Sequence, residues 1–231
     1  MTIGMIVAMP EELESFLAGI GTAEKTENIP GYEVRSYKIN NDHIVIVGSG
    51  VGEIAAAAST QMLITQYHAD MIVNFGVVGG LTPEMTLSKV VVIDRLVHYD
   101  YDASPFYDGL VPGQYPGMES IYFYPDRRLL ELALAAEPGL KTVTCASADK
   151  FVDGAEAKKL LHEKYDADIC EMEAAGILLT CRRCGVPSLF IKAVSDGVTG
   201  GAEEFEKMIK EASKVCADVV LTLTSSIINA R

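Results

Sequence analysis

The sequence predicts a three-layer α/β/α fold with a central mixed β-sheet, built as a single domain over residues 1–231. Two observations support this prediction. Short apolar runs typical of buried strands alternate with helical segments along the chain, which is the order of elements in α/β proteins. No stretch has the composition of a linker, and 49% of the residues are hydrophobic, which is enough to form one sizeable core.

The first half of the chain consists of apolar runs that lead directly into helices. Residues 3–8 are typical of a buried strand, and Pro10 with the acidic residues after it is typical of a first helical turn. Residues 40–42 are typical of a turn between two adjacent strands. In order, we expect strands at 3–8, 32–39, 43–47, 71–75 and 89–97, and helices from residue 10 and over 53–67.

The second half continues the alternation after an irregular stretch at 99–125, where Tyr, Asp, Pro and Gly dominate. A long loop of this kind in a compact domain is usually functional or part of an interface. In α/β sheets, ligands gather beyond the carboxyl ends of the strands, so the residues that follow each strand are candidates for a site. After the loop we expect helices at 126–136, 155–164, 171–184 and from about 201, and strands at 141–147 and 187–194.

The composition disfavours several classes of protein. The chain has 19 basic and 32 acidic residues, a net charge of −13, which disfavours binding to nucleic acid. We expect no membrane span, because no run of about 18 apolar residues occurs. The N-terminal residues lack the basic stretch of a signal peptide. The five cysteines, an odd number mostly inside apolar segments, favour reduced core thiols and a cytoplasmic protein.

Two short motifs have both a structural and a functional interpretation. The glycine-rich segments 48–52 and 76–80 follow strands, where they form tight turns or allow a ligand to approach the backbone. Neither has the pattern of a dinucleotide-binding fingerprint or of a phosphate-binding P-loop. Cys181 and Cys184 form a single C-x-x-C pair in an expected helix, and without a second pair we favour packing over zinc or redox chemistry.

Three carboxyl groups are the strongest candidates for chemistry. Asp196 directly follows the apolar run 189–194, although an acid there could also cap a helix. Glu173 lies among small residues at an expected helix start, where a buried carboxylate without a partner would be costly unless it serves a site. Glu12 could be an ordinary exposed acid of a first helical turn. All three are expected at one edge of one sheet, which makes them more informative together than alone.

Several segments resemble, in the same order over nearly the whole chain, those of the 5′-methylthioadenosine/S-adenosylhomocysteine nucleosidases, members of the nucleoside phosphorylase superfamily. Their joint order is more specific than any one of them. The resemblance implies a nucleoside phosphorylase-like fold, hydrolysis of an adenine nucleoside in methionine salvage, and a cytoplasmic homodimer without a cofactor or metal. The segments that carry it are 6–12, 48–52, 74–81, 147–151, 171–174 and 193–196.

The resemblance also implies a role for each of the three acids. Asp196 corresponds to the general acid that protonates N7 of adenine, Glu12 to the group that positions or deprotonates water, and Glu173 to the ligand of the ribose hydroxyls. Breaking a ribosyl C–N bond leaves an oxocarbenium-like sugar and an electron-rich purine. One acid must therefore hold a proton to donate while another group activates water.

Further substrate-binding residues follow from the same resemblance. Phe151 is expected to stack near adenine, with the backbone of Val152 reading its Watson–Crick edge. Met172 is expected against the sugar and Val51 beside the 5′-substituent. Phe106 and Pro116 are expected to close the pocket of a neighbouring subunit. The full expected set is Met9, Val51, Val77, Val78, Phe151, Val152, Met172, Ser195, Phe106 and Pro116.

The sequence departs from the family pattern in three places. Many members have serine where Val77 stands and arginine where Lys192 stands, which affects the placement of water or ribose. Residues 197–202 lack the aromatic residue that often covers the 5′-substituent, a place that Phe205 could take. These departures leave the 5′-substituent open and keep another purine nucleoside, such as a futalosine-type compound, as an alternative.

Two further alternatives belong to other functional classes. A related phosphorylase would need to hold phosphate, which such enzymes do with a Gly-Asp-Pro-x-Arg-type segment after the first strand. Here residues 9–12 are Met-Pro-Glu-Glu, whose acids would repel phosphate. A non-catalytic nucleoside-binding protein would keep the pocket without turnover, and a purely structural protein would leave the three acids unexplained.

Overall fold

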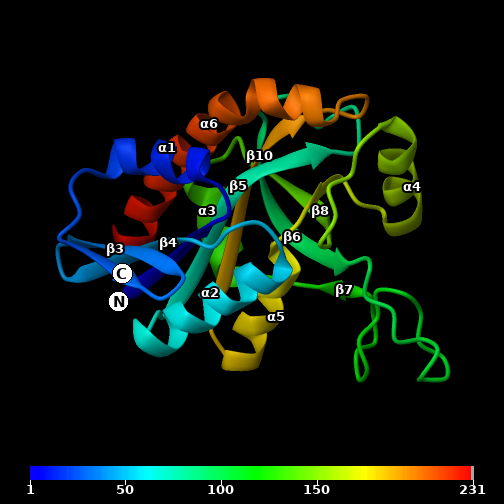
Figure 1. The fold of residues 1–231 in the computed structure, drawn as a ribbon, viewed down its shortest axis with the longest axis horizontal. Helices are drawn as coiled ribbons and strands as arrows, with labels where there is room; N and C mark the ends of the chain where they lie inside the picture. Colours follow the sequence, from blue (N-terminus) through cyan, green and yellow to red (C-terminus); the bar gives the residue numbers. More distant parts are fainter. Residues whose placement is uncertain (230–231) are drawn as a thin grey trace.

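The computed structural model describes residues 1–229, in which ten strands form one mixed sheet (Figure 1). Five of them, β5, β6, β8, β9 and β10, pair in a closed ring, and β1, β4, β3 and β2 extend the sheet from β5. The strands are β1 (Thr2–Val7), β2 (Lys25–Ile29), β3 (Tyr32–Ile39), β4 (Asp42–Gly48), β5 (Met71–Gly80), β6 (Val90–His98), β7 (Tyr122–Phe123), β8 (Lys141–Ser147), β9 (Ile169–Glu171) and β10 (Ser188–Asp196).

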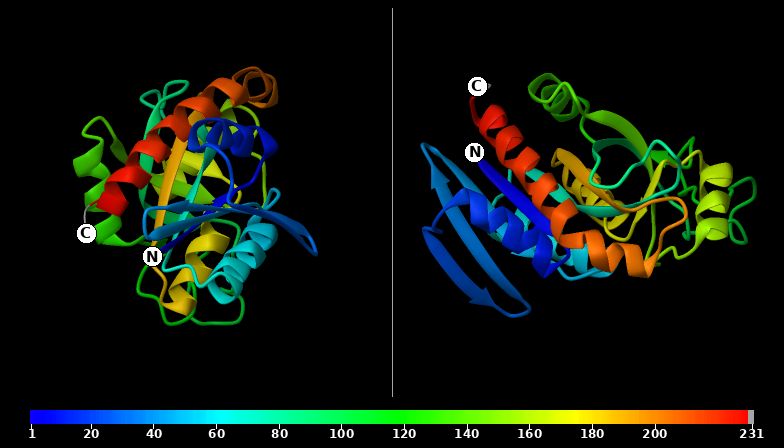
Figure 2. Two further views of the ribbon diagram at one scale, coloured as in Figure 1. Left: turned by 90° about the vertical axis from the view of Figure 1, so that its left-hand side faces the viewer. Right: turned by 90° about the horizontal axis from the view of Figure 1, so that it is seen from above.

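Helices cover both faces of this sheet, so the predicted three-layer α/β/α architecture is confirmed (Figure 2). Helices α1, α3 and α6 pack together on one face, α2 and α5 pack against each other on the opposite face, and α4 lies at one end (Figure 1). The helices are α1 (Pro10–Ile20), α2 (Glu53–Gln66), α3 (Arg127–Ala136), α4 (Ala155–Tyr165), α5 (Ala174–Cys184) and α6 (Ala202–Asn229).

Each face of the sheet has its own hydrophobic core. On the α1–α6 side, Phe16 and Val220 pack against the outward side chains of the central strands. On the α2–α5 side, Leu63 and Ile177 do the same. Apolar residues three or four apart on each helix form the buried stripe that holds it to the sheet. No helix within residues 1–229 has the length and the apolar character to cross a bilayer.

The parallel pairing of the central strands brings three strand ends to one place. β1 runs parallel to both β4 and β5, and β10 runs parallel to β5. The carboxyl ends of these strands therefore meet at one edge of the sheet. The register pairs Ile6 with Asn74 and Asp196 with Gly79, so the residues after β1 and the end of β10 lie on either side of β5.

Two element boundaries differ from the sequence-based predictions. The segment 76–80, expected as a turn, continues strand β5, because Val77 and Val78 pair with β10 and Gly79 and Gly80 pair with β9. The helix expected over 171–184 begins at Ala174, because residues 169–171 form strand β9 beside β8. Both errors concern segments whose strand partners lie far away in the sequence.

Two other features also differ from expectation. Strand β2 was not predicted, because its charged residues lack an apolar pattern and it lies exposed at the edge of the sheet beside β3. The interpretation of Asp196 as a helix cap is wrong, because this residue ends strand β10 and the next helix starts at Ala202. Asp196 is therefore placed by the sheet register rather than by a helix terminus.

Candidate active site

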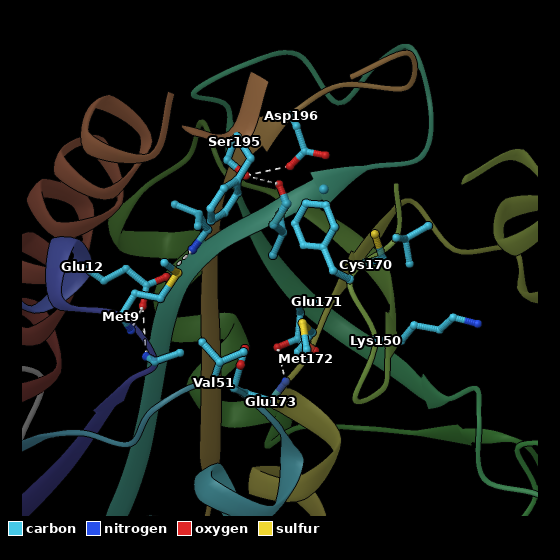
Figure 3. A pocket seen from close by; sticks show the side chains of 17 residues that line it. Met9, Glu12, Val51, Lys150, Cys170, Glu171, Met172, Glu173, Ser195 and Asp196 are labelled. Atoms are coloured by element: carbon cyan, nitrogen blue, oxygen red, sulfur yellow. Dashed lines mark hydrogen bonds between the residues drawn. The ribbon is translucent and has the colours of Figure 1, made fainter. Parts of the chain in front are cut away.

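A cavity of about 340 Å³ opens at the shared carboxyl ends of β1, β5 and β10, a volume in the range of small-molecule sites. Figure 3 shows that Glu12, Glu173 and Asp196 approach it from three different elements. The three candidate acids therefore surround one space. The cavity is lined by Ala8, Met9, Glu12, Val51, Val77, Val78, Gly79, Lys150, Phe151, Val152, Cys170, Glu171, Met172, Glu173, Ser195, Asp196 and Phe205.

Glu12 lies in the first turn of α1 and is held by backbone amides. Its Oε2 accepts hydrogen bonds from the N–H groups of Ala8 (3.0 Å) and Met9 (2.9 Å), and its Oε1 accepts one from Val77 in β5 (2.8 Å). The side chain is only 3% exposed. Burial raises the pKa of Glu12, while the amide donors and the charge of Lys192 act in the opposite direction. The result is a fixed carboxyl with enhanced basicity.

Glu173 precedes α5 and reaches across to the loop before α2. Its Oε1 accepts a hydrogen bond from the N–H of Gly52 at 2.8 Å. Burial and the nearby charge of Glu171 raise the pKa of Glu173 to about 7, against the lowering effects of Lys192 and of the Gly52 amide. Glu173 therefore titrates close to neutral pH, in contact with the cavity.

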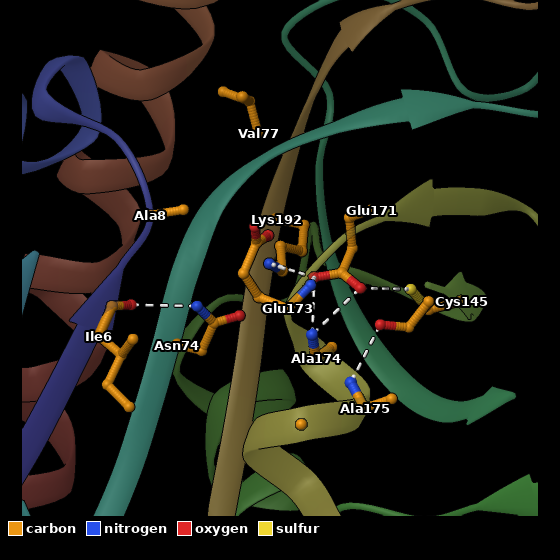
Figure 4. A network of polar contacts seen from close by, with 12 residues as sticks. Ile6, Ala8, Asn74, Val77, Cys145, Glu171, Glu173, Ala174, Ala175 and Lys192 are labelled. Carbon is orange, nitrogen blue, oxygen red and sulfur yellow. Dashed lines mark hydrogen bonds and ion pairs between the residues drawn. The ribbon is translucent and has the colours of Figure 1, made fainter. Parts of the chain in front are cut away.

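A buried ion pair lies beside Glu173 (Figure 4). The Nζ of Lys192 on β10 lies 3.1 Å from Oε2 of Glu171, and both side chains are 2% exposed. Glu171 also accepts hydrogen bonds from the amides of Glu173 (3.1 Å) and Ala174 (2.9 Å). Burial alone would lower the pKa of Lys192, but the charges of Glu171, Glu173 and Glu12 outweigh it and the pKa is raised. Lys192 is thus a permanent cation between the acids.

A second buried carboxyl supports this region from outside the cavity lining. Glu53, at the start of α2, accepts a hydrogen bond from the Ser147 hydroxyl at 2.6 Å and another from the amide of Gly176 in α5. Burial, followed by the charge of Glu171, raises the pKa of Glu53 to about 8. Glu53 therefore ties α2 to α5 and β8 directly behind Glu173.

Asp196 is held by side chains instead of by amides. The Ser195 hydroxyl lies 2.9 Å from its Oδ1, and the Nζ of Lys158 on α4 lies 2.5 Å from its Oδ2. Asp196 is 2% exposed and Lys158 is completely buried. Gly79 of β5 lies against the carboxyl, because a Cβ atom there would stand 3.2 Å from Oδ2.

The structure brings together most of the residues predicted from the sequence. The three acids and eight substrate-binding candidates line the cavity: Met9, Val51, Val77, Val78, Phe151, Val152, Met172 and Ser195. Phe106 and Pro116 do not line it, because they belong to the long excursion between β6 and β7, where Phe106 is 85% exposed. Their expected role in the pocket of a neighbouring subunit stays a prediction.

Sequence reasoning missed several residues of the site. Lys158 resembles the other lysines of its helix, and nothing in the local sequence marks it as buried. The two acids flanking Met172 were a usable signal for Glu171, the anchor of Lys192. Phe205 was not missed, because it was a sequence-based candidate for the aromatic position, and it does reach the cavity, where its ring meets that of Phe151 edge-on with centroids 5.7 Å apart.

In the part of the chain that the structure describes, no group of three or more cysteine, histidine or acidic side chains is arranged so that it could hold a metal ion. The C-x-x-C pair consists of a buried Cys181 and an exposed Cys184, both free thiols. Burial raises the pKa of Cys181 to about 12, which keeps this thiol neutral and unreactive. The preference for a packing role is consistent with this environment.

Comparison with known proteins identifies the family. The chain matches the family model of the phosphorylase superfamily over residues 2–225. It is 31% identical to a 5′-methylthioadenosine/S-adenosylhomocysteine nucleosidase of Geobacillus sp. (strain WCH70), with 98% of this chain and 99% of the relative covered. The enzyme of the same name from Haemophilus ducreyi is 30% identical, with 98% of each chain covered. The chain belongs to this nucleosidase family.

Solved structures agree with the family assignment. The S-adenosylhomocysteine nucleosidase of Streptococcus pyogenes, in complex with 5-methylthiotubericidin, superposes with a TM-score of 0.88 at 27% identity, covering 97% of this chain and 96% of that one. The futalosine hydrolase of Helicobacter pylori superposes with a TM-score of 0.91 at 24% identity, with 97% of each chain covered, a likeness of fold alone. The nucleoside phosphorylase-like fold expected from the sequence is confirmed.

Proposed function

We propose that this nucleosidase family member hydrolyses the N-glycosidic bond of 5′-methylthioadenosine or S-adenosylhomocysteine, releasing adenine and a 5-substituted ribose. The observation that carries the proposal is the meeting of Glu12, Glu173 and Asp196 around one cavity of about 340 Å³. Three acids from distant parts of the chain can serve the water, the sugar and the base of one bound nucleoside. The names of the relatives support the same reaction.

In this proposal Glu12 handles the nucleophile. Its two oxygens are held by three backbone amides, so the carboxylate cannot rotate away from the cavity. A carboxyl whose pKa is raised by burial is a stronger base than a solvated one. As the C1′–N9 bond breaks, water adds to C1′ and Glu12 accepts its proton. The Val77 side chain is not needed for this step, because Val77 acts through its N–H.

The sugar and the base are assigned to the other two acids. Glu173 accepts hydrogen bonds from the ribose hydroxyls, with Met172 packed against the ring. Asp196 provides the proton that N7 needs when the electron pair of the broken bond moves onto the purine. Phe151 and Phe205 form an aromatic wall at the expected base position. Each tenfold acceleration corresponds to about 1.4 kcal/mol of transition-state stabilisation.

The charges around the cavity favour water over phosphate as the nucleophile. Within the described residues 1–229, the cavity lining contains four acids and no arginine. Two buried lysines lie beside these acids, and each is already paired, Lys192 with Glu171 and Lys158 with Asp196. A phosphate dianion would therefore meet Glu12 and Glu173 without a guanidinium to bind it.

The proposal is tested by following base release across a panel of nucleosides, with and without phosphate. We expect adenine to be released from 5′-methylthioadenosine or S-adenosylhomocysteine without added phosphate or metal. Strict dependence on phosphate would point to a phosphorylase, and binding without release to a nucleoside-binding protein. Faster release from a futalosine-type nucleoside would reassign the 5′-substituent, at the end of the cavity where Val51 is half-exposed.

We further propose that the protein acts as a homodimer in the cytoplasm, in methionine salvage, with residues 1–231 as one domain. Large apolar side chains support the dimer, because Ile54 on α2 is 81% exposed and Phe106 is exposed on the loop expected to reach a partner. The five free thiols support a reducing compartment. Sedimentation analysis should give twice the chain mass, and Ile54→Lys should shift it toward the monomer.

A further inference from the structure

Asp196 and Lys158 form a buried pair that the roles described above do not use. The Nζ of Lys158 lies 2.5 Å from Oδ2 of Asp196 and 2.6 Å from the carbonyl oxygen of Gly197. Lys158 is wholly buried and is not part of the cavity lining, so it lies behind the carboxyl. It therefore acts on a bound nucleoside only through Asp196.

This arrangement creates a difficulty for Asp196 as a lone general acid. Its Oδ1 accepts from the Ser195 hydroxyl and its Oδ2 accepts from the Lys158 ammonium. A carboxyl with a donor on each oxygen and a cation in contact is stabilised as the carboxylate, which has no proton to give. The contact between Nζ and Oδ2 places the lysine where it can hold the acidic proton of the pair.

We propose that Lys158 holds the proton that the leaving purine receives. In this relay, the proton passes from Lys158 to Asp196 and from Asp196 to N7. This proposal rests on the proposed hydrolysis. In the step, the C1′–N9 electron pair moves onto the purine, a proton moves from Nζ to Oδ2 of Asp196, and the carboxyl proton moves to N7. Lys158 becomes a neutral amine and Asp196 ends as the carboxylate.

The second proton of the reaction is handled by Glu12, on the opposite side of the cavity from Asp196. Water that adds to C1′ gives its proton to Glu12. After the products leave, Glu12 releases that proton to solvent and Lys158 takes one up, which restores the starting charges. Lys158 is thus a positioning and proton-holding residue, and Asp196 remains the group that touches the substrate.

Other titratable groups near the pair do not compete for this proton. The Cys170 thiol faces the pair from β9, and burial raises its pKa to about 12, so it stays neutral. Glu204 of α6 accepts a hydrogen bond from the Gly197 N–H at 2.7 Å, whereas Lys158 donates to the Gly197 carbonyl oxygen, which belongs to the next peptide group. The exchange is therefore confined to Lys158 and Asp196.

The decisive variant is Lys158→Arg, which keeps the positive charge but holds its proton too tightly to transfer it. We expect kcat for adenine release from 5′-methylthioadenosine to fall by about tenfold or more, with KM nearly unchanged. The matched control is Lys159→Arg, because Lys159 is the exposed neighbour on the same helix. Normal kcat in a folded Lys158→Arg protein would overturn the relay and leave Lys158 as a structural cation.

The pH dependence of Lys158→Met gives an independent test. With the relay, a lysine holds the transferred proton in the wild type, whereas in Lys158→Met only a carboxyl can hold it. Carboxyl groups as a class lose their proton at lower pH than ammonium groups, so the alkaline limb of kcat should move to lower pH by about one unit or more in this variant. An unchanged limb, or one that moves to higher pH because a repelling cation has been removed, contradicts the proposal.

A substrate whose leaving group departs without being protonated distinguishes loss of the relay from a general folding defect. A 4-nitrophenyl riboside with the same 5′-substituent needs no protonation on departure, so both Lys158 variants should hydrolyse it at close to the wild-type rate. Equal losses on both substrates would overturn the relay in favour of a folding defect. If neither variant folds, a wild-type alkaline limb below about pH 7 overturns it. Wild-type protein inactive on every nucleoside would instead refute the proposed function.

Discussion

The two ends of the cavity hold their acids in opposite ways. At the end where we propose that water binds, the water side, Glu12 is held by the backbone amides of Ala8, Met9 and Val77. At the end where we propose that the base binds, the base side, Asp196 is held by two side chains, the Ser195 hydroxyl and the Lys158 ammonium. Both carboxyls are almost fully buried, so the difference lies in the partners rather than in exposure.

Because the partners differ, side-chain substitutions are expected to have different effects at the two ends. Amide donors are supplied by any residue except proline, so the water side tolerates a changed side chain such as Val77 in place of serine. The base side depends on side-chain identity, so one substitution can alter its protonation. We therefore expect changes at Glu12 to affect both stability and kcat, and changes at Asp196 to affect mainly kcat.

The largest expected effect is that of Asp196→Asn, which tests the chemical side of the comparison. Asparagine keeps an oxygen that can accept from Lys158 but cannot carry an acidic proton. We expect kcat to fall by roughly 10²–10⁴ in a protein that stays folded, with some loss of melting temperature because Lys158 loses its buried counter-charge. Base release and circular dichroism measure the two quantities, and near-normal turnover would remove the proposed acid.

Glu12→Gln should reduce both activity and stability. An amide has only one acceptor oxygen, so either Val77 or the pair Ala8 and Met9 would face an NH₂ group. We expect kcat to fall by roughly 10²–10³ and the free energy of unfolding by about 1–3 kcal/mol. Urea titration measures the second effect. If Glu12→Gln is as stable as wild type, the hydrogen bonds from the backbone amides do not contribute to folding, which contradicts the proposed difference between the two ends.

Gly76→Ala should disturb the water side without replacing an acidic residue. A Cβ atom at this position would overlap the carboxyl of Glu12 and displace it from its amides. We expect a loss in kcat of about tenfold, with a smaller loss of stability. The control is Gly48→Ala, where the added Cβ would meet only Leu13 at 3.7 Å. Equal behaviour of the two variants would argue against a rigidly held Glu12.

The smallest expected effect concerns stability against pH. The pKa of Glu53 rises from 4.5 to about 8 on folding, through burial and the charge of Glu171. The folded state therefore binds more protons than the unfolded state, and stability falls as pH rises through this window. Glu53→Gln should flatten this slope by on the order of 1–2 kcal/mol, measured by urea titration at pH 5 and pH 8. An unaltered slope would assign the dependence to other groups.

The sequence predicted the order of elements and the three acids, because both follow from local patterns and from the family motifs. Residues 189–194 marked the end of β10 by their apolar character alone, and Pro10 marked the start of α1. Strand β9 escaped prediction because three residues are too short to show a period, and their strand character comes from pairing with β8. Strand β2 escaped because its burial pattern is that of an exposed edge.

Lys158 shows why part of the site could not be predicted. Its position on α4 and its contact with β10 join residues 38 apart in the chain. Its neighbour Lys159 is mostly exposed, so composition does not distinguish the two lysines. Only the docking of α4 against the end of β10 buries one of them beside Asp196.

Strand β5 links the positions of the two acids. Val77 holds Glu12 through its N–H, and Gly79, two residues on, lies against Asp196. Two steps along a strand span about 6.6 Å, so the backbone of β5 fixes the spacing between its contact with one acid and its contact with the other. An insertion or deletion between these two residues would therefore move the acids relative to each other.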